Sequence, residues 1–411
     1  MQNARRLPAT WLMGLTNAPF GLTGGFCAVV LPELLAAQSI PAGQIATIAA
    51  TILSPGFWIF AISPLLDAWL SRRTYALIFG SFTALCVAFT VAHPGSPGLV
   101  VAVMIPGFAA AMLYQGAVGG WMGSLIDKRE DSRLGVWFSV SNLGAGGLMM
   151  VLAGELVSRF TRVQAGTLMG LAILLPMLLF LTIPSPPSHR RPARESFGRF
   201  NRELVSLLGQ RRVLMALALF VLPAASFALT NVLGGTGSDF SASEHTVGLF
   251  AGVGSSAAGI VGSLLLFPLA RRFRLRRVYL AIGITGAIFT LSLLLLPRAP
   301  WTFGLAITGE NLFQALAFAT GNAITFEIIG PDNPFAATLF TVLTAATNLP
   351  ITYMQYLDGR GYGWRGLTGA FLADATVSIA ACVLLGWMLA RWQATAQSGL
   401  QPLASVPENA D

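Results

Sequence analysis

Acidic side chains are rare and costly inside apolar segments, yet this chain places two of them there. The stretch ITGENLFQALAFATGN, residues 307–322, carries Glu310, with Gln314 one helical turn further on. No lysine or arginine lies deep in any apolar stretch. Because a low dielectric favours the uncharged carboxylic acid, we expect Glu310 to carry a proton or to donate a hydrogen bond to a solute. Asp374 lies at similar depth and gives the same expectation. The alternative for each acid is a hydrogen bond to a neighbouring helix with no further role.

Amide and hydroxyl side chains recur at helical spacing in a second apolar stretch. Positions i, i+3, i+7, i+11 and i+14 share one face of a helix, and a polar stripe of this length is costly against lipid. We therefore expect it to line a wet cavity or a helix contact; its residues are Thr341, Thr344, Asn348, Thr352 and Gln355. Five further residues are candidates for the same solute-binding cavity, and each also fits a hydrogen bond between packed helices: Asn17, Gln115, Asn142, Asn311 and Gln314.

The composition is that of a membrane protein. Of the 411 residues, 55% are hydrophobic and 10% are charged, whereas soluble proteins carry about a quarter charged residues. The net charge of +8 comes from basic residues in the loops between apolar runs, which indicates membrane topology rather than nucleic-acid binding. Cys27, Cys86 and Cys382 stand alone in apolar segments, so we expect no disulfide, metal site or cofactor.

Twelve apolar runs are each long enough to cross a bilayer. In hydrocarbon a span must satisfy its own backbone hydrogen bonds, so the sequence predicts an all-α membrane protein with twelve transmembrane helices in two pseudo-symmetric six-helix bundles. The expected spans are 11–35, 44–66, 74–92, 98–123, 134–157, 164–183, 213–234, 247–269, 278–297, 301–328, 336–357 and 366–390. The expected domains are an N-terminal bundle (1–184), a cytoplasmic linker (185–212), a C-terminal bundle (213–394) and a cytoplasmic tail (395–411).

The basic residues are strongly biased to one side of the membrane. If the N-terminus is cytoplasmic, all but five of the 25 Lys and Arg residues fall on the cytoplasmic side. Positive charge marks cytoplasmic loops, so we expect both termini in the cytoplasm. The five exceptions are Arg159, Arg162, Arg298, Arg360 and Arg365.

Two loops carry related sequences 204 residues apart. They read SPLLDAWLSRRTYAL at 63–77 and FPLARRFRLRRVYLAIG at 267–283. At this constant offset Pro64 matches Pro268, Arg72 matches Arg276, and Arg73 matches Arg277. The repeat indicates a duplicated six-span unit, which in the larger secondary transporters encloses a site between the halves near the bilayer midplane.

The loop SPLLDAWLSRRTYAL resembles the charged loop between spans two and three of the major facilitator superfamily. In particular it is similar to the SPLMDR…RRR form of the AmpG-type muropeptide permeases and the related acetyl-CoA transporters. The segment 333–366, NPFAATLFTVLTAATNLPITYMQYLDGRGYGWRG, resembles the eleventh-span region of the same family. Those relatives usually carry acids in a QD…D pattern in the fourth span, whereas this chain reads YQGAVGGWMG, with Gly116 and Gly120 at those places.

The charged loops admit two interpretations. The arginines are typical topology anchors, and Asp67 is then a charge at a helix end. The resemblance implies instead a gate, in which Asp67 pairs across the cytoplasmic surface with an arginine or a helix N-terminus and holds one conformation closed. The candidate gating residues are Asp67, Arg72, Arg73, Arg276 and Arg277. An exposed pair of this kind is worth about 0–1 kcal/mol.

We therefore expect a secondary active transporter that moves a small organic solute by alternating access, coupled to protons, in the manner of the muropeptide and nutrient permeases. The alternatives are proton-driven efflux of hydrophobic compounds and a non-transporting membrane sensor. An enzyme is not expected, because no histidine lies in a span to serve a nucleophile as base. The expected partners are the solute, protons and the lipid bilayer, for a monomer in a bacterial inner membrane.

Overall fold

The computed structural model describes residues 7–185, 202 and 205–398, and within them it contains helices and no strands. The first half comprises α1 (Thr10–Leu15), α2 (Ala18–Gly25), α3 (Leu31–Ala36), α4 (Ala42–Leu53), α5 (Pro55–Trp58), α6 (Arg72–Ala92), α7 (Pro97–Leu125), α8 (Asp131–Arg159) and α9 (Arg162–Leu174). The second half comprises α11 (Arg211–Val221), α12 (Leu229–Leu233), α13 (Glu244–Gly248), α14 (Ser255–Leu264), α15 (Leu266–Arg272), α16 (Leu275–Ser292), α17 (Pro300–Ile329) and α18 (Ala336–Ser398). Most of the predicted linker and the last 13 residues of the predicted tail lie outside the described residues.

Several predicted spans consist of more than one helix. The first span continues through a π-helical turn at Phe26–Val30, and the eighth through another at Leu249–Gly254. In the other direction, α18 combines the eleventh and twelfth spans across a kink at Arg365 and Gly366. Within the described residues, ten helical segments are long and apolar enough to cross a membrane, with α18 as one of them.

The predicted seventh span, 213–234, is not one continuous helix. It forms α11 and α12, separated by an irregular segment that contains Pro223. Proline lacks a backbone N–H and disfavours a helical conformation in the residue before it, which explains the break. At the break, Phe227 has a positive φ of 48°. A Cβ placed on Gly283 of α16 would clash with the carbonyl oxygen of Ala224, so this glycine lets the irregular backbone pack closely.

Several helix boundaries repeat between the two halves. The offset of 204 carries the end of α7, Leu125, onto Ile329, where α17 ends. It carries the start of α6 to position 276 and the start of α8 to position 335, each within one residue of the start of α16 and α18. The sequence repeat therefore corresponds to a structural one, and the predicted arrangement of two pseudo-symmetric bundles is confirmed.

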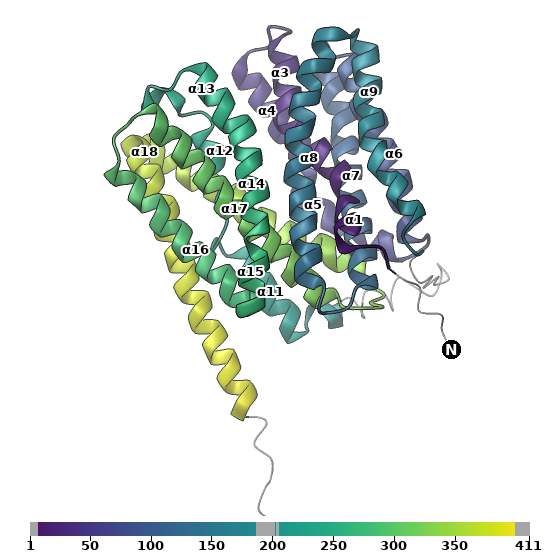
Figure 1. The fold of residues 1–411 in the computed structure, drawn as a ribbon, viewed down its shortest axis with the longest axis vertical. Helices are drawn as coiled ribbons and strands as arrows, with labels where there is room; N and C mark the ends of the chain where they lie inside the picture. The colour runs from purple at the N-terminus through teal and green to yellow at the C-terminus, as the bar shows by residue number, and fades with distance from the viewer. Residues whose placement is uncertain (1–6, 186–201, 203–204, 399–411) are drawn as a thin grey trace, which may run out of the picture.

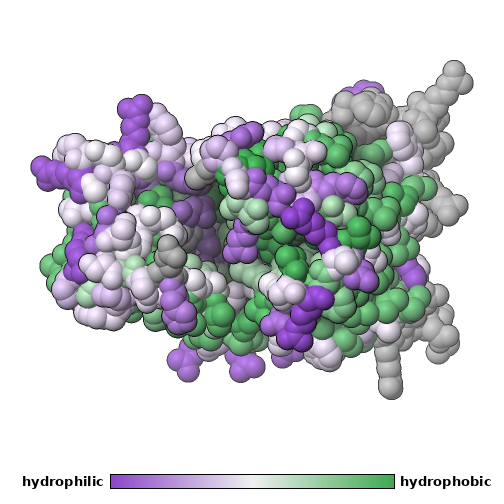
Figure 2. Space-filling view, turned by 90° about the horizontal axis from the view of Figure 1, so that it is seen from above, coloured by the Kyte–Doolittle hydropathy of each residue, from purple (hydrophilic) through white to green (hydrophobic). Residues whose placement is uncertain are grey.

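The two halves lie side by side, with the purple-to-blue elements on one side and the green-to-yellow elements on the other (Figure 1). Both ends of the described chain lie at the lower face of this view, which we call the terminal face. The other end of the molecule is called the opposite face, and there a hollow separates the two halves (Figure 2).

Near the terminal face the two halves pack closely through glycines. A Cβ on Gly120 of α7 would clash with the backbone of Ala337 at the start of α18, and one on Gly135 of α8 would lie 2.6 Å from the backbone nitrogen of Ala323 in α17. Small residues allow such close approach between membrane helices. The molecule is therefore closed near one face and hollow at the other.

Candidate functional site

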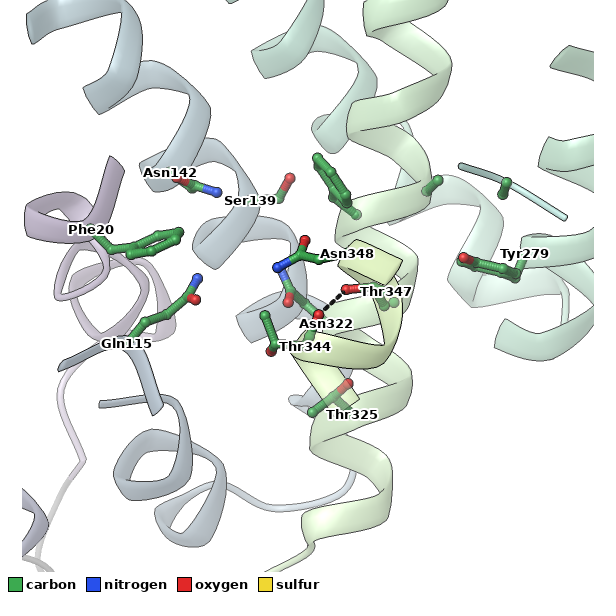
Figure 3. A pocket seen from close by; sticks show the side chains of 14 residues that line it. Phe20, Gln115, Ser139, Asn142, Tyr279, Asn322, Thr325, Thr344, Thr347 and Asn348 are labelled. Atoms are coloured by element: carbon green, nitrogen blue, oxygen red, sulfur yellow. Dashed lines mark hydrogen bonds between the residues drawn. The ribbon is translucent and has the colours of Figure 1, made fainter. Parts of the chain in front are cut away.

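An amide-lined cavity lies where the two halves meet (Figure 3). Its volume is about 70 Å³, which accommodates a few water molecules but is well below the roughly 300 Å³ of small-molecule sites. We call it the amide cavity. Its polar lining comes from both halves: Gln115, Ser139 and Asn142 from α7 and α8, and Asn322, Thr325, Thr344, Thr347 and Asn348 from α17 and α18.

Two larger cavities continue from the amide cavity toward the opposite face. The middle cavity, of about 440 Å³, shares Asn142 with the amide cavity and is also lined by Asn231, Asn311 and Gln314. The outer cavity, of about 850 Å³, shares Ser256 with the middle cavity. Both volumes suit a small organic molecule. The hollow in Figure 2 lies between the same two halves.

The outer cavity is mostly apolar. Among the described residues that line the three cavities, Glu33 of α3 is the only charged one. Much of the remaining lining is glycine, and a Cβ on Gly248 or Gly252 would meet no atom within 4 Å. Glycine at these two positions therefore widens the cavity and does not bring helices together.

The polar stripe of the eleventh span divides between several environments. Thr344 and Asn348 line the amide cavity, whereas Thr341 is 2% exposed and packs against α7. Thr352 is exposed and bonds the carbonyl of Asn348 within its own helix. Gln355 accepts a hydrogen bond from Asn231 at 3.3 Å, which links the eleventh span to the seventh.

The other predicted solute-binding residues also separate into two groups. Gln115, Asn142, Asn311 and Gln314 line the cavities. Asn17 is 1% exposed and donates to the carbonyl of Phe138, so it joins the first span to α8. Gln314 has a structural contact as well, because its amide donates to the carbonyl of Phe227 at the break in the seventh span.

Glu310 points into the C-terminal bundle rather than into these cavities. It is fully buried, and its Oε1 accepts a 2.6 Å hydrogen bond from the hydroxyl of Thr290 in α16. Its neighbours on α17, Asn311 and Gln314, face the middle cavity. Glu310 therefore lines none of the three cavities, although Gln314, one turn further along the same helix, lines the middle one.

Three carboxyl groups gather inside the C-terminal bundle. Glu310, Asp358 and Asp374 lie close enough to interact electrostatically, and each is at most 3% exposed. Glu310 Oε2, Asp374 Oδ1 and both oxygens of Asp358 have no hydrogen-bond partner. We call these three residues the carboxyl cluster. No group of three metal-ligating side chains in metal-binding geometry occurs among the described residues.

Asp67 sits where the two halves meet at the terminal face. Its side chain is 0% exposed and accepts a 2.8 Å hydrogen bond from Nε of Arg72. It also accepts 2.8 Å hydrogen bonds from the backbone N–H and the hydroxyl of Thr338, in the first turn of α18. The Asp67–Arg72 pair is therefore buried. The value of about 0–1 kcal/mol expected from the sequence applies to an exposed pair.

Arg72 extends the same contact to the loop before α18. Its guanidinium donates to the carbonyl of Asn333 at 2.8 Å, to that of Pro334 at 3.1 Å, and to the hydroxyl of Ser124 at 3.2 Å. We call Asp67 and Arg72 with these partners the terminal clamp. Arg73 lies outside it and donates to Ser185 at 3.4 Å on the surface.

The second copy of the loop forms no comparable clamp. Arg276 lies 3.7 Å from Glu327 of α17, and its Nε has no hydrogen-bond partner. Arg277 is exposed. Both residues were predicted to take part in gating, and both lie within the second half without a described contact to the first.

The glycines of the fourth span have a packing reason. A Cβ on Gly116 would clash with the hydroxyl of Thr341, and one on Gly120 would clash with the backbone of Ala337. Acids at these places would hold α7 away from α18. Glycine at these places therefore allows α7 and α18 to pack closely beside the clamp.

Comparison with known proteins gives structural matches only. No protein-family profile and no curated protein sequence matches the chain. The human organic anion transporter MFSD10 (TETRAN) is similar over 92% of this chain and 98% of its own, with a TM-score of 0.64 and 15% identity. The proton:xylose symporter XylE is similar over 92% and 94%, with a TM-score of 0.68 and 13% identity. A bacterial homologue of the iron transporter ferroportin in an outward-facing state is similar over 94% and 98%, with a TM-score of 0.65 and 15% identity.

These matches and the repeated six-span halves define a multi-pass membrane protein with the major facilitator fold. At identities of 13–15% the likeness establishes the fold alone.

Proposed function

We propose that this protein is a secondary active transporter that moves a small organic solute by alternating access. One observation carries the proposal: the cavities between the two halves reach the opposite face, while the terminal clamp joins the halves at the terminal face. A structure closed at one end and hollow at the other is one of the two states that rocking of two bundles requires. A non-transporting sensor, the alternative outside transport, does not need such a clamp.

The terminal clamp acts as the gate of this cycle. The buried charge of Asp67 is neutralised by Arg72 and lies at the N-terminus of α18, where the helix dipole favours an anion. Opening the terminal face breaks its bonds to Thr338, because α18 belongs to the other half. Arg276 and Arg277 have no part in this gate.

The carboxyl cluster carries the coupling proton. Three acids that share a buried space cannot all be ionised without strong mutual repulsion, so they bind and release protons. Glu310 of the cluster lies on α17, and the same helix supplies Asn311 and Gln314 to the middle cavity. XylE, which has a similar fold, is described as a proton:xylose symporter.

The cavities favour a partly apolar, neutral or cationic solute. Among the described lining residues of the three cavities there is no cation, and Glu33 supplies negative charge. Organic anions, which MFSD10 is named for transporting, lack a partner in this lining. Resemblance to the AmpG-type permeases supports uptake of a cell-wall fragment or nutrient, and the apolar outer cavity supports efflux of a hydrophobic compound as the second candidate.

The terminal face is the cytoplasmic one, and the protein is a monomer in a bacterial inner membrane. The bias of Lys and Arg toward this face supports the orientation. The structure then corresponds to an outward-facing state. The ferroportin homologue is described in the same state.

The proposal is tested by screening and then by flux. Purified protein is heated with muropeptides, siderophores, acyl-CoAs and drugs, because a ligand raises the melting temperature of the fold that binds it. The hits are then assayed for uptake into proteoliposomes. Net movement of solute is expected; binding or turnover without movement would indicate a sensor or an enzyme.

Proton coupling is tested with Glu310→Gln. The amide keeps the shape but cannot exchange a proton, so uptake driven by a pH gradient should lose its pH dependence. The melting temperature should not fall, because burial of a carboxyl with an unpaired oxygen is costly. Glu155→Gln is the control, since Glu155 pairs with Arg159 at the surface. Unaltered pH dependence in Glu310→Gln would refute the role of the cluster.

A further inference from the structure

The second copy of the duplicated loop lacks the acid that the first copy carries. The position 204 residues after Asp67 is Arg271, so a negative charge is replaced by a positive one. In the first copy, Arg72 is satisfied by Asp67, by Ser124 and by two backbone carbonyls. Its counterpart Arg276 has a 3.7 Å contact with Glu327 and a buried Nε without a partner.

A cavity of about 640 Å³ is lined in part by Arg276. Arg274, Arg276 and Arg277 line it against a single acid, Glu327. The charged lining therefore has an excess of positive charge. The cavity lies near the terminal face between the start of α16 and the part of α18 around residues 386–390.

The remaining lining is apolar, and most of it belongs to candidate membrane-spanning segments. Leu280 of α16 and Leu389 of α18 belong to segments that are long and apolar enough to span a membrane. Trp387, next to this wall, is 53% exposed and stacks with Arg391 at 4.3 Å. Tryptophan is enriched at the membrane–water interface, so the cavity is placed at the level of the lipid head groups.

We propose that this cavity binds the phosphate of an anionic phospholipid from the leaflet at the terminal face. A guanidinium presents paired N–H donors that match two phosphate oxygens, and the buried Nε of Arg276 has no hydrogen-bond partner. An acyl chain then lies along the apolar wall. Basic pockets between membrane helices are suited to anionic head groups. The lipid supplies the negative charge that Asp67 supplies in the first copy.

A free phosphate compound offers the same charge but leaves the apolar wall uncovered. The lipid therefore fits the whole lining, whereas the soluble anion fits only its arginines. This site does not depend on the proposed transport function, because it lies outside the three cavities between the halves.

The experiment measures lipid binding to the full chain in detergent, by native mass spectrometry and by melting temperature. Phosphatidylglycerol is compared with phosphatidylcholine, and inorganic phosphate and glycerophosphoglycerol serve as soluble probes. Phosphatidylglycerol should bind and stabilise the protein, and the other three should do so weakly. Arg276→Gln should weaken binding of phosphatidylglycerol about fivefold, the size expected for one basic contact. Glu327→Gln should strengthen it, because a competing anion is removed.

Arg272→Gln is the matched control. Arg272 is exposed on the same loop, carries the same charge and does not line the cavity. Equal weakening by Arg272→Gln and Arg276→Gln would show general attraction of lipid to a basic surface and would overturn the proposal. Equal stabilisation by inorganic phosphate would replace the lipid with a soluble anion. Equal binding of phosphatidylcholine would also overturn it. The opposite effects expected for Arg276→Gln and Glu327→Gln keep the test valid if one variant folds poorly.

Discussion

Asp67 connects the loop before α6 with the first turn of α18. Its carboxylate is fully buried and accepts hydrogen bonds from Arg72 and Thr338. Removing one partner of a buried ion pair costs about 3–5 kcal/mol, compared with about 0–1 kcal/mol at a surface. Because Thr338 belongs to the second half, part of this cost falls only on the conformation in which the halves meet at the terminal face.

Asp67→Asn should therefore disturb the cycle more than the fold. The asparagine keeps the shape but loses the charge at the helix N-terminus, a loss of about 2 kcal/mol in a partly buried geometry. This corresponds to about a thirtyfold shift away from the closed terminal face. The transport rate should fall, measured by proteoliposome uptake, while the yield of folded protein by size exclusion stays similar.

Arg73→Gln is the control for this variant. Arg73 carries the same kind of charge in the same loop, but it donates a 3.4 Å bond to Ser185 at the surface. Its flux should remain near that of the unaltered protein. Undiminished flux in Asp67→Asn would remove the gating role of the clamp.

Asp358 belongs to the carboxyl cluster but is not among the candidate residues predicted from the sequence. Hydropathy predicts that the eleventh span ends at position 357, which places Asp358 in a loop. In the structure α18 stays helical up to the kink at Arg365, which places Asp358 inside the bundle. Its spacing of three residues after Gln355 continues the polar stripe and was the available signal. Hydropathy ends a span early when a helix continues with charged residues.

At the scale of elements, the break in the seventh span is the main surprise. Hydropathy predicted one helix over 213–234, because apolar content does not report backbone conformation. The irregular segment is tolerated where other helices satisfy its polar backbone groups, and Gln314 bonds the carbonyl of Phe227 there. Pro223 was the visible sign of this break. Broken helices of this kind line binding sites in transporters.

Gly248, the last residue of α13, offers a test of the outer cavity. A Cβ on Gly248 meets no atom within 4 Å, so Gly248→Trp should fold normally and fill space inside the cavity. Solute binding should weaken by about 1–3 kcal/mol, in line with the cost of overpacking a filled site. The measurement is the solute affinity by thermal shift, together with uptake.

Gly154→Trp provides the matched control for the cavity. Gly154 of α8 also has open space around it, but it does not line any of the three cavities. Uptake should be unaffected there. Normal affinity and uptake in Gly248→Trp would place the solute elsewhere.

At the scale of the whole molecule, the sequence repeat was the most informative signal. Loop residues matched at an offset of 204 predicted two related halves, and the ends of α7 and α17 obey the same offset. Span number and fold class follow from hydropathy, because a bilayer permits few backbone solutions. Hydropathy does not predict the direction in which Glu310 points. That direction depends on how α17 is rotated against α16, which a single sequence does not specify.

The central claim is that the cavities open to one face while the clamp closes the other. The most direct test replaces Cys27, Cys86 and Cys382 with alanine and introduces Ser256→Cys, which lies in both the middle and the outer cavity. A membrane-impermeant thiol reagent is then applied from either face in vesicles of defined orientation. We predict fast labelling from the opposite face and slow labelling from the terminal face, with the latter accelerated by Asp67→Asn. Labelling at equal rates from both faces, or from the terminal face alone, would contradict the account.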